Sequence, residues 1–198
     1  MPVLIDKLKE LIHPNAIQIP CYDALKKEKI FTLVEKKSPG SQIRIAGIPE
    51  GSVIFNLDDF FPIPKPPLPY IFTAEYKSVC CRADYVIVSP DCLDENKNHI
   101  VFIEMKNGVD EMSHIRDQLR GARCFMDYCV SLINHFWKCK ITEIDEDDCR
   151  YVACLKTGSD VGNRYDNNEP PHTNVDDPLK LEGRRLYRYN QLIGRKPR

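Results

Sequence analysis

The sequence predicts an α/β domain with a central mixed β-sheet flanked by helices. Residues 83–88 (ADYVIV) and 100–106 (IVFIEMK) are rich in β-branched and aromatic residues, and the polar loop between them predicts an antiparallel hairpin. The pattern then changes to a helical period over residues 113–138 and returns to a strand pattern at residues 151–155 (YVACL). This succession of elements predicts one domain, residues 1–198, in which a sheet and its helices share a core.

The composition predicts a folded protein. The chain has 198 residues, of which 42% are hydrophobic, and its 28 Lys and Arg residues nearly balance its 29 Asp and Glu residues. Disorder requires low hydrophobicity together with high net charge, so a chain with a formal charge of -1 is expected to fold. A chain of this length supports one core and no second independent domain.

Cysteine usage and apolar runs predict where the protein works. The nine cysteines are an odd number and contain no CxxC pair, which argues against both a disulfide framework and a zinc ribbon. We expect most of them to be reduced and buried. No apolar run approaches the roughly 20 residues of a membrane-spanning helix, and residues 1–14 carry charges that a signal peptide would not. These features predict a cytoplasmic protein without a membrane partner.

The N-terminal part of the chain predicts two helices. Residues 3–12 have a helical pattern that ends before Pro14. Asp23 is a suitable N-cap for a second helix over residues 24–37. Residues 38–40 (SPG) would end that helix, because proline cannot continue it and glycine readily adopts the positive φ of a C-cap.

The segments that flank these elements predict strands and loops. Residues 42–46 and 53–57 alternate weakly between apolar and polar residues and predict strands. Residues 62–69 contain five prolines and predict an extended surface loop. Residues 159–177 are polar and contain two adjacent prolines, which predicts a second long loop.

The long helix is the most clearly predicted element. Its apolar residues are spaced by four and three positions, as expected for the buried stripe of an amphipathic helix. They are Ile115, Leu119, Ala122, Met126, Cys129, Ile133 and Phe136. Three arginines, Arg116, Arg120 and Arg123, line a neighbouring face of the same helix.

Three charged residues are predicted to converge at one end of the hairpin. If the hairpin is centred near Asp94, Asp84 faces Glu104, and Lys106 lies on the same face because side chains alternate along a strand. A structural salt bridge needs only two of these residues, and two adjacent carboxylates repel unless a positive group lies between them. A divalent metal ion such as Mg²⁺ meets that requirement, because it prefers hard oxygen ligands.

The same residues form a pattern that resembles a known family. Asp84, the Glu-Met-Lys segment 104–106 and a following helix with Gln118 resemble the PD-(D/E)XK phosphodiesterases, the restriction-endonuclease-like superfamily. The resemblance covers residues 83–155, the core that carries the motif, and Asp84 follows alanine where the motif has proline. A literal Pro-Asp pair at residues 90–91 is disfavoured because it lies in the loop, several residues of about 3.3 Å each from the level of the glutamate.

The resemblance implies a restriction-endonuclease-like core and a metal-dependent nuclease. Asp84 and Glu104 would hold Mg²⁺, or Mn²⁺ in its place, and a metal-bound water would attack a phosphodiester bond of DNA in a single step. Lys106 would orient that water and stabilise transition-state charge. Gln118, at the edge of the apolar stripe, would direct its amide toward the metal. RNA fits the same chemistry as DNA, and a homodimer fits as well as a monomer.

The resemblance leaves two alternatives open. A further carboxylate of such a site usually comes from the N-terminal helix, where Glu28 and Glu35 are both available. The rival function is a nucleic-acid-binding or assembly subunit that keeps the nuclease fold without cleaving. Aspartate, glutamate and lysine together on one face favour the enzyme, because a binding subunit would not require that combination.

Charge is distributed in blocks, although the net charge is near zero. Residues 143–148 (EIDEDD) carry five acidic residues, whereas residues 180–198 contain seven bases and one acidic residue. This basic C-terminal segment either binds the phosphate backbone, forms a solvated tail or packs on the core. The candidate nucleic-acid-binding residues are Arg184, Arg185 and Arg188 in this segment and Arg116, Arg120 and Arg123 on the long helix.

Overall fold

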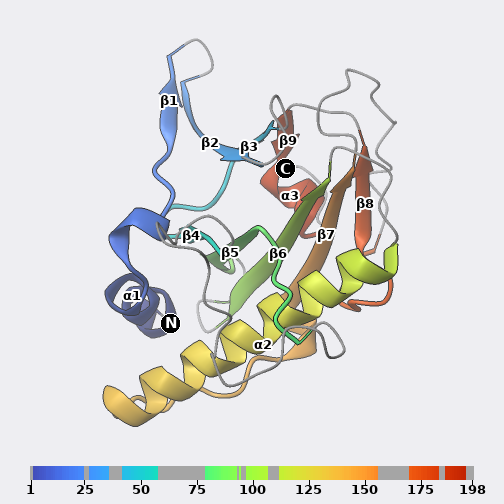
Figure 1. Cartoon of the computed structure of the whole chain (residues 1–198). Helices are drawn as coiled ribbons and strands as arrows, with labels where there is room; N and C mark the ends of the chain where they lie inside the picture. Colours follow the sequence, from blue (N-terminus) through green and yellow to red (C-terminus); the bar gives the residue numbers. More distant parts are fainter. Residues whose placement is uncertain are drawn as a thin grey trace.

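The computed structural model describes residues 2–24, 27–35, 42–57, 79–92, 94, 97–106, 112–155, 170–182 and 186–194. In these residues, nine strands form two mixed β-sheets, one of five strands and one of four. Two of the helices lie on the same side of the larger sheet (Figure 1). The protein therefore has the α/β class that the sequence predicts.

The larger sheet contains the strands predicted from the middle of the sequence. Its order is β4 (Val53–Asn56), β5 (Tyr85–Pro90), β6 (Asn98–Lys106), β7 (Cys149–Leu155) and β8 (Leu179–Glu182). Strands β4, β5 and β6 are antiparallel to one another, whereas β6, β7 and β8 run parallel. Parallel neighbours need a crossover connection, and the long helix provides it between β6 and β7.

The β5–β6 hairpin has the register expected from the sequence. Val86 pairs with Phe102, as predicted. Continued two positions along each strand, the same register places Asp84 opposite Glu104. Every residue of β6 except the last, Lys106, is buried, because both faces of the sheet are covered.

The two helices predicted most directly by periodicity are confirmed. They bury apolar stripes against one face of the larger sheet, and the stripe predicted on the longer helix is buried except for Phe136, which is 75% exposed. The helical elements are α1 (Pro2–Leu11), the 3₁₀ turn η1 (Pro14–Ala16), α2 (Met112–Phe136), the 3₁₀ turn η2 (Glu146–Asp148) and α3 (Tyr189–Leu192).

The smaller sheet contains a strand where the sequence analysis predicts a helix. Its order is β1 (Cys21–Asp23), β2 (Glu28–Val34), β3 (Gln42–Ala46) and β9 (Leu186–Arg188). The helix predicted over residues 24–37 is wrong, because β2 pairs with both β1 and β3. The β-branched and aromatic side chains of residues 30–34 suit a strand. Lys27, with a φ of 54°, turns the chain before β2 and does not begin a helix.

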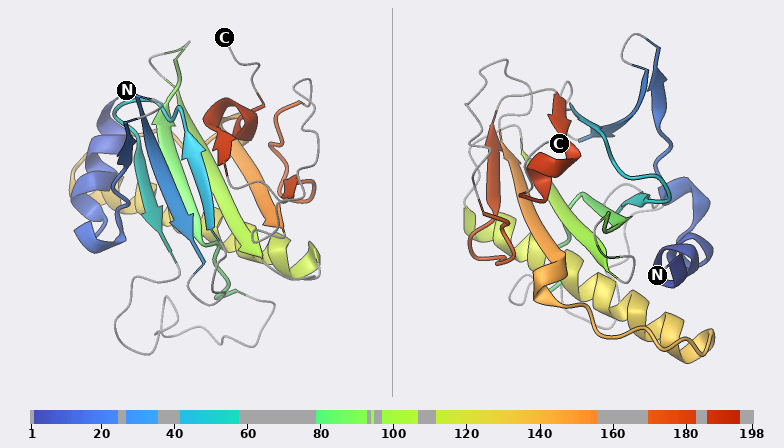
Figure 2. Two further views of the ribbon diagram at one scale, coloured as in Figure 1. Left: turned by 90° about the horizontal axis from the view of Figure 1, so that it is seen from above. Right: turned by 180° about the vertical axis from the view of Figure 1, so that it is seen from behind.

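The larger sheet has a different cover on each face. Helices α1 and α2 pack on one face around buried residues such as Phe55, Phe102 and Leu119. The smaller sheet packs on the other face, where Ile43 and Ile87 belong to a second apolar cluster (Figure 2). The expectation of a sheet flanked by helices is therefore correct for one face, whereas sheet-on-sheet packing buries most of the other.

The C-terminal segment is built into the fold. Strand β8 belongs to the larger sheet and β9 to the smaller one, and Tyr187, Tyr189 and Leu192 are buried. The apolar residues between the bases therefore anchor the segment, and packing on the core is confirmed for residues 186–194. Arg184 and Arg185 lie outside the described residues, as do the predicted loop at 62–69 and most of the one at 159–177.

The cysteines are free, but the expectation that most are buried is wrong. Of the nine, Cys129, Cys149 and Cys154 are buried. The others are exposed or half-buried because they occupy loops, the edge strand β1 or the outer face of α2. In the part of the chain that the structure describes, no helix is long and apolar enough to span a membrane.

Candidate functional site

Asp84 and Glu104 meet where β5 begins and β6 ends. Asp84 immediately precedes β5 and is 5% exposed, whereas Glu104 lies within β6 and is fully buried. The backbone N–H of Met105 donates a 2.7 Å hydrogen bond to Asp84 Oδ2. This bond holds the Asp84 carboxyl group across the strand pair, next to Glu104.

Lys106 lies beside the same two carboxyl groups. Because side chains alternate along a strand, Glu104 and Lys106 share with Phe102 the face of the sheet that packs against the helices. Lys106 Nζ lies 2.8 Å from Glu104 Oε1, and the lysine side chain is 21% exposed. The structure thus brings Asp84, Glu104 and Lys106 together at the border between core and solvent.

The environment of Asp84 opposes its ionisation. Burial raises its pKa to about 9, and the neighbouring charges of Glu104 and Glu35 act in the same direction. The hydrogen bond from Met105 and the positive charge of Lys106 lower the pKa, but they do not offset the burial. The pair therefore concentrates acidic groups in a place where water cannot stabilise their charges.

Glu35 is the N-terminal carboxylate that reaches this site. The Tyr85 hydroxyl donates a 2.9 Å hydrogen bond to the Val34 carbonyl and accepts a 3.0 Å hydrogen bond from the Val34 N–H. These bonds tie the end of β2 to the start of β5, and the charge of Glu35 raises the pKa of Asp84. The other candidate, Glu28, forms an ion pair with Arg188 at the opposite end of β2.

Gln118 lies on α2, close to the segment that leads into β5. Its Nε2 makes a long contact of 3.5 Å with the carbonyl oxygen of Arg82, two residues before Asp84. Its Oε1 is buried and has no hydrogen-bond partner among the residues that the structure describes. The described residues therefore leave this buried acceptor unsatisfied.

Asp91, from the literal Pro-Asp pair, lies at the other end of the hairpin. It follows β5 directly, and its N–H donates a 2.9 Å hydrogen bond to the Lys97 carbonyl across the loop. Its carboxylate lies 3.2 Å from His99 Nε2. The structure therefore separates Asp91 from Glu104 by most of the length of β6.

The site offers two carboxylates as protein ligands for Mg²⁺. Among the described residues, no three side chains of His, Cys, Asp or Glu form a ready-made metal cluster. Mg²⁺ commonly takes one or two protein carboxylates and fills its remaining positions with water or substrate phosphates. Asp84 and Glu104, buried as a pair and facing one lysine, meet that description.

Two of the candidate nucleic-acid-binding arginines form ion pairs on the surface. Arg120 Nη1 lies 2.9 Å from Asp117, and its other terminal nitrogen contacts Asp176. Arg188 contacts Glu28. The arginine side chains are 47% and 50% exposed, respectively, so both remain open to solvent.

Arg123 and Arg116 are less exposed than a solvated basic face would require. Arg123 donates hydrogen bonds to Asp127 (3.1 Å), the Ile144 carbonyl (2.7 Å) and Cys149 Sγ (2.8 Å), which ties α2 to the segment before β7. Arg116 is half-buried, and its Nε has no hydrogen-bond partner within the described ranges. Arg123 therefore has a structural role in the fold.

Together, the fold and the site define an α/β protein of two mixed sheets with a buried carboxylate pair at one end of a hairpin. Comparison with protein-family models, curated proteins and solved structures found no match to the chain.

Proposed function

We propose that the protein is a cytoplasmic, metal-dependent nuclease that hydrolyses phosphodiester bonds in DNA. The observation that carries this proposal is the burial of Asp84 beside Glu104, with Lys106 Nζ 2.8 Å from the second carboxylate. Burying like charges together lowers stability, and strained electrostatics of this kind cluster at functional sites. The same residue types at this spacing carry the resemblance to the PD-(D/E)XK phosphodiesterases.

Each residue of the proposed site has a separate role. Asp84 and Glu104 would hold Mg²⁺, or Mn²⁺ in its place, and such an ion supplies Lewis-acid catalysis when bound. Lys106, at the border with solvent, would attract the phosphate and stabilise the negative charge that develops on its oxygens. Gln118 would use its buried amide oxygen to orient a donor group entering beside it.

The surface arginines supply contacts to the phosphate backbone in this proposal. Arg120 and Arg188 are the better candidates, because exposed ion pairs contribute only about 0–1 kcal/mol and phosphates can compete for the guanidinium groups. Arg123 contributes less, because its hydrogen bonds serve the fold. RNA would meet the same groups, so the assay includes an RNA strand of the same sequence.

The test is incubation of the protein with supercoiled circular DNA, linear DNA and RNA in the presence of Mg²⁺, Mn²⁺ or EDTA. We expect nicking of the circular DNA with either metal and no product with EDTA. Nicking establishes endonuclease action, whereas loss of the linear substrate alone indicates an exonuclease. Cleavage that persists in EDTA would contradict the proposed metal dependence.

The rival function, a nucleic-acid-binding or assembly subunit without cleavage, makes a different prediction in the same experiment. Such a subunit would bind DNA equally well with and without metal and would leave every substrate intact. One observation favours this rival function. The ion pair between Lys106 and Glu104 already gives one carboxylate a cationic partner. Binding without cleavage in all metal conditions would replace the enzyme with this rival.

A further inference from the structure

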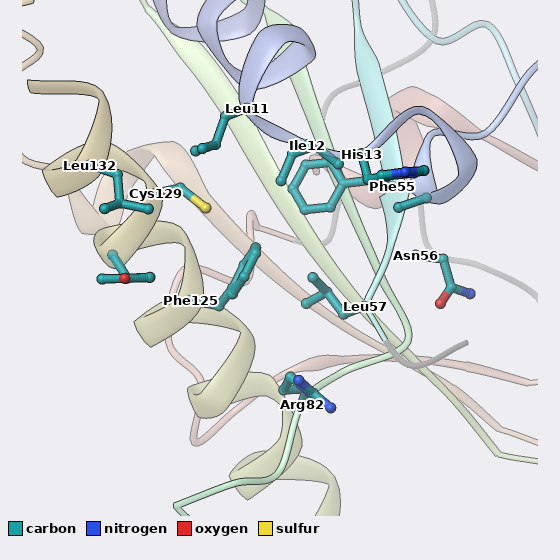
Figure 3. A pocket seen from close by; sticks show the side chains of 12 residues that line it. Leu11, Ile12, His13, Phe55, Asn56, Leu57, Arg82, Phe125, Cys129 and Leu132 are labelled. Atoms are coloured by element: carbon teal, nitrogen blue, oxygen red, sulfur yellow. The ribbon is translucent and has the colours of Figure 1, made fainter. Parts of the chain in front are cut away.

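An apolar cavity lies between α2 and the edge strand β4. Its volume is about 270 Å³, and its walls include Phe55 and Leu57 on one side and Phe125 and Leu132 on the other (Figure 3). The two phenylalanine rings have centroids 6.4 Å apart and planes inclined by 57°. An apolar cavity of about 150 Å³ accommodates benzene. The larger volume here therefore has room for a bicyclic aromatic ring.

Arg82 connects this cavity to the carboxylate site. It lines the end of the cavity away from Leu11 (Figure 3) and precedes Asp84 by two residues, which span at most about 7 Å of chain. Leu57, in the cavity wall, donates its N–H to the Asp84 carbonyl at 2.8 Å. Gln118 on α2 contacts the Arg82 carbonyl oxygen at 3.5 Å. The cavity and the carboxylates are therefore neighbouring parts of one region.

One face of α2 runs along both parts of this region. Gln118, Gly121, Phe125, Tyr128 and Leu132 are spaced by three and four residues and so share a side of the helix. At Gly121 a Cβ atom would lie only 1.7 Å from the Cys81 carbonyl oxygen, so this glycine lets the segment that carries Arg82 approach the helix. Tyr128, which is 58% exposed, also lines the cavity with an aromatic ring.

We propose that the cavity receives one unpaired base of the DNA strand whose phosphate lies at the carboxylate site. This inference rests on the proposed nuclease function and narrows its substrate to DNA with an unpaired base. Aromatic side chains stack on the flat face of any base. Arg82, between the cavity and Asp84, provides a guanidinium group for the phosphate of that nucleotide. Asn56 and His13 add polar groups to the cavity wall for the polar edge of the base.

An aliphatic ligand would account for fewer of these features. It would use the apolar walls, but it would use neither the aromatic residues as stacking surfaces nor the guanidinium group beside the carboxylates. A nucleotide uses all three, because its base is flat and aromatic and its phosphate is anionic. The base cavity and the phosphate site would then hold adjacent parts of one nucleotide.

The test compares a fully paired DNA duplex with the same duplex carrying one unpaired 2-aminopurine. Binding is measured by fluorescence anisotropy in EDTA, where the proposed cleavage cannot occur, and stacking by quenching of the 2-aminopurine fluorescence. We expect tighter binding of the duplex with the unpaired base, together with quenching. Tyr128→Ala should weaken this binding about 10-fold and restore the fluorescence, since base stacking on one aromatic ring accounts for an effect of this order.

Two further variants keep the result interpretable. Tyr128→Phe retains the ring and should behave as the wild type. Phe136→Ala removes another exposed aromatic ring of α2 that does not line the cavity, and it should also leave binding unchanged. Equal affinity for the two duplexes, or an unchanged quenching signal in Tyr128→Ala, would overturn the base cavity.

Failure of the cavity proposal and failure of the nuclease proposal are distinguishable. Metal-dependent cleavage without a preference for the unpaired base supports the nuclease proposal and contradicts the base cavity. Quenching of the unpaired 2-aminopurine without cleavage in Mg²⁺ supports the base cavity and contradicts the nuclease proposal. The protein would then bind DNA without cutting it.

Discussion

The two ends of the β5–β6 hairpin each bury an aspartate, and they surround it differently. At one end, Asp84 lies beside Glu104 and is also influenced by the charge of Glu35, so acidic groups outnumber the one lysine that acts on them. At the other end, Asp91 lies 3.2 Å from His99, which gives one acid and one base. An excess of buried acidic groups favours a cationic ligand, because neighbouring carboxylates repel each other unless a positive group lies between them.

The Asp91 end has a structural task that the Asp84 end does not share. Ser89 Oγ shares a short hydrogen bond with the Tyr189 hydroxyl, which fixes α3 on the larger sheet. Nearby, the buried side chain of Arg150 donates a 3.1 Å hydrogen bond from Nε to the Ile193 carbonyl. These bonds join the last described segment of the chain to the sheet. We therefore expect ligand chemistry at the Asp84 end, whereas the hydrogen bonds at the Asp91 end anchor the C-terminal segment.

The largest expected effect is the loss of cleavage when the Asp84 end is changed. Asp84→Asn, Glu104→Gln and Lys106→Ala should each lower the rate of DNA cleavage by at least about 10³-fold, because the first two remove a carboxylate that would hold the metal and the third removes the ammonium group that would stabilise charge on the phosphate. Mg²⁺ binding, measured by calorimetry, should weaken for the two carboxylate variants and much less for Lys106→Ala. Circular dichroism should show an intact fold, and wild-type cleavage in any one variant would remove that residue from the site.

The next effect is a loss of stability at the other end. Asp91→Asn removes the carboxylate beside the buried His99 side chain and should lower the free energy of unfolding by about 1–3 kcal/mol, measured by urea denaturation. Its cleavage rate, assayed at a temperature where the protein stays folded, should equal that of the wild type. A stable Asp91→Asn variant that cleaves no DNA would reverse the roles assigned to the two ends.

Asp84→Asn should have the opposite effect on stability. The pKa of Asp84 is raised to about 9 in the fold, against about 3.9 in an unfolded chain. The folded state therefore binds an extra proton between these values, and the free energy of unfolding falls as the pH rises through this window. Asparagine removes that dependence and should stabilise the protein by about 0.5–2 kcal/mol near pH 7. Urea denaturation at pH 5 and pH 8 measures it, and a destabilised variant at pH 8 would contradict the electrostatic explanation.

The sequence predicts the Asp84 end well because its geometry is local. Strand alternation and one hairpin register are sufficient to place Asp84, Glu104 and Lys106 together. Asp23 as an N-cap and the terminating residues 38–40 favour a helix that would include Glu35, although the β-branched and aromatic side chains of residues 30–34 favour the strand that forms. The approach of Glu35 to Asp84 depends on contact between two sheets, which no local pattern encodes.

The fold of the C-terminal segment also depends on contacts with distant residues, which a local pattern does not predict. Its bases leave phosphate binding, a solvated tail and packing on the core all open, and the residues between them form strands in both sheets. Burial of Tyr187 and Tyr189 depends on partners more than 90 residues earlier in the chain, such as Ser89 for the second tyrosine. The charge pattern alone therefore does not predict whether the segment packs on the core. That depends on the distant residues that its apolar side chains contact.

The smallest expected effect comes from the contact that brings Glu35 to the Asp84 end. Tyr85→Phe removes the hydroxyl that bonds to both backbone groups of Val34 and should lower the free energy of unfolding by about 0.5–1.5 kcal/mol. It should also lower the pKa of Asp84, because the charge of Glu35 is then no longer held beside it. Titration of the Asp84 carboxyl carbon by nuclear magnetic resonance measures this shift. Tyr22→Phe, on an exposed tyrosine of the edge strand β1, is the matched control and should change neither quantity. A lower stability with an unchanged Asp84 pKa would show that Tyr85 holds the two sheets together without placing Glu35, and the acidic excess at this end would then rest on Asp84 and Glu104 alone.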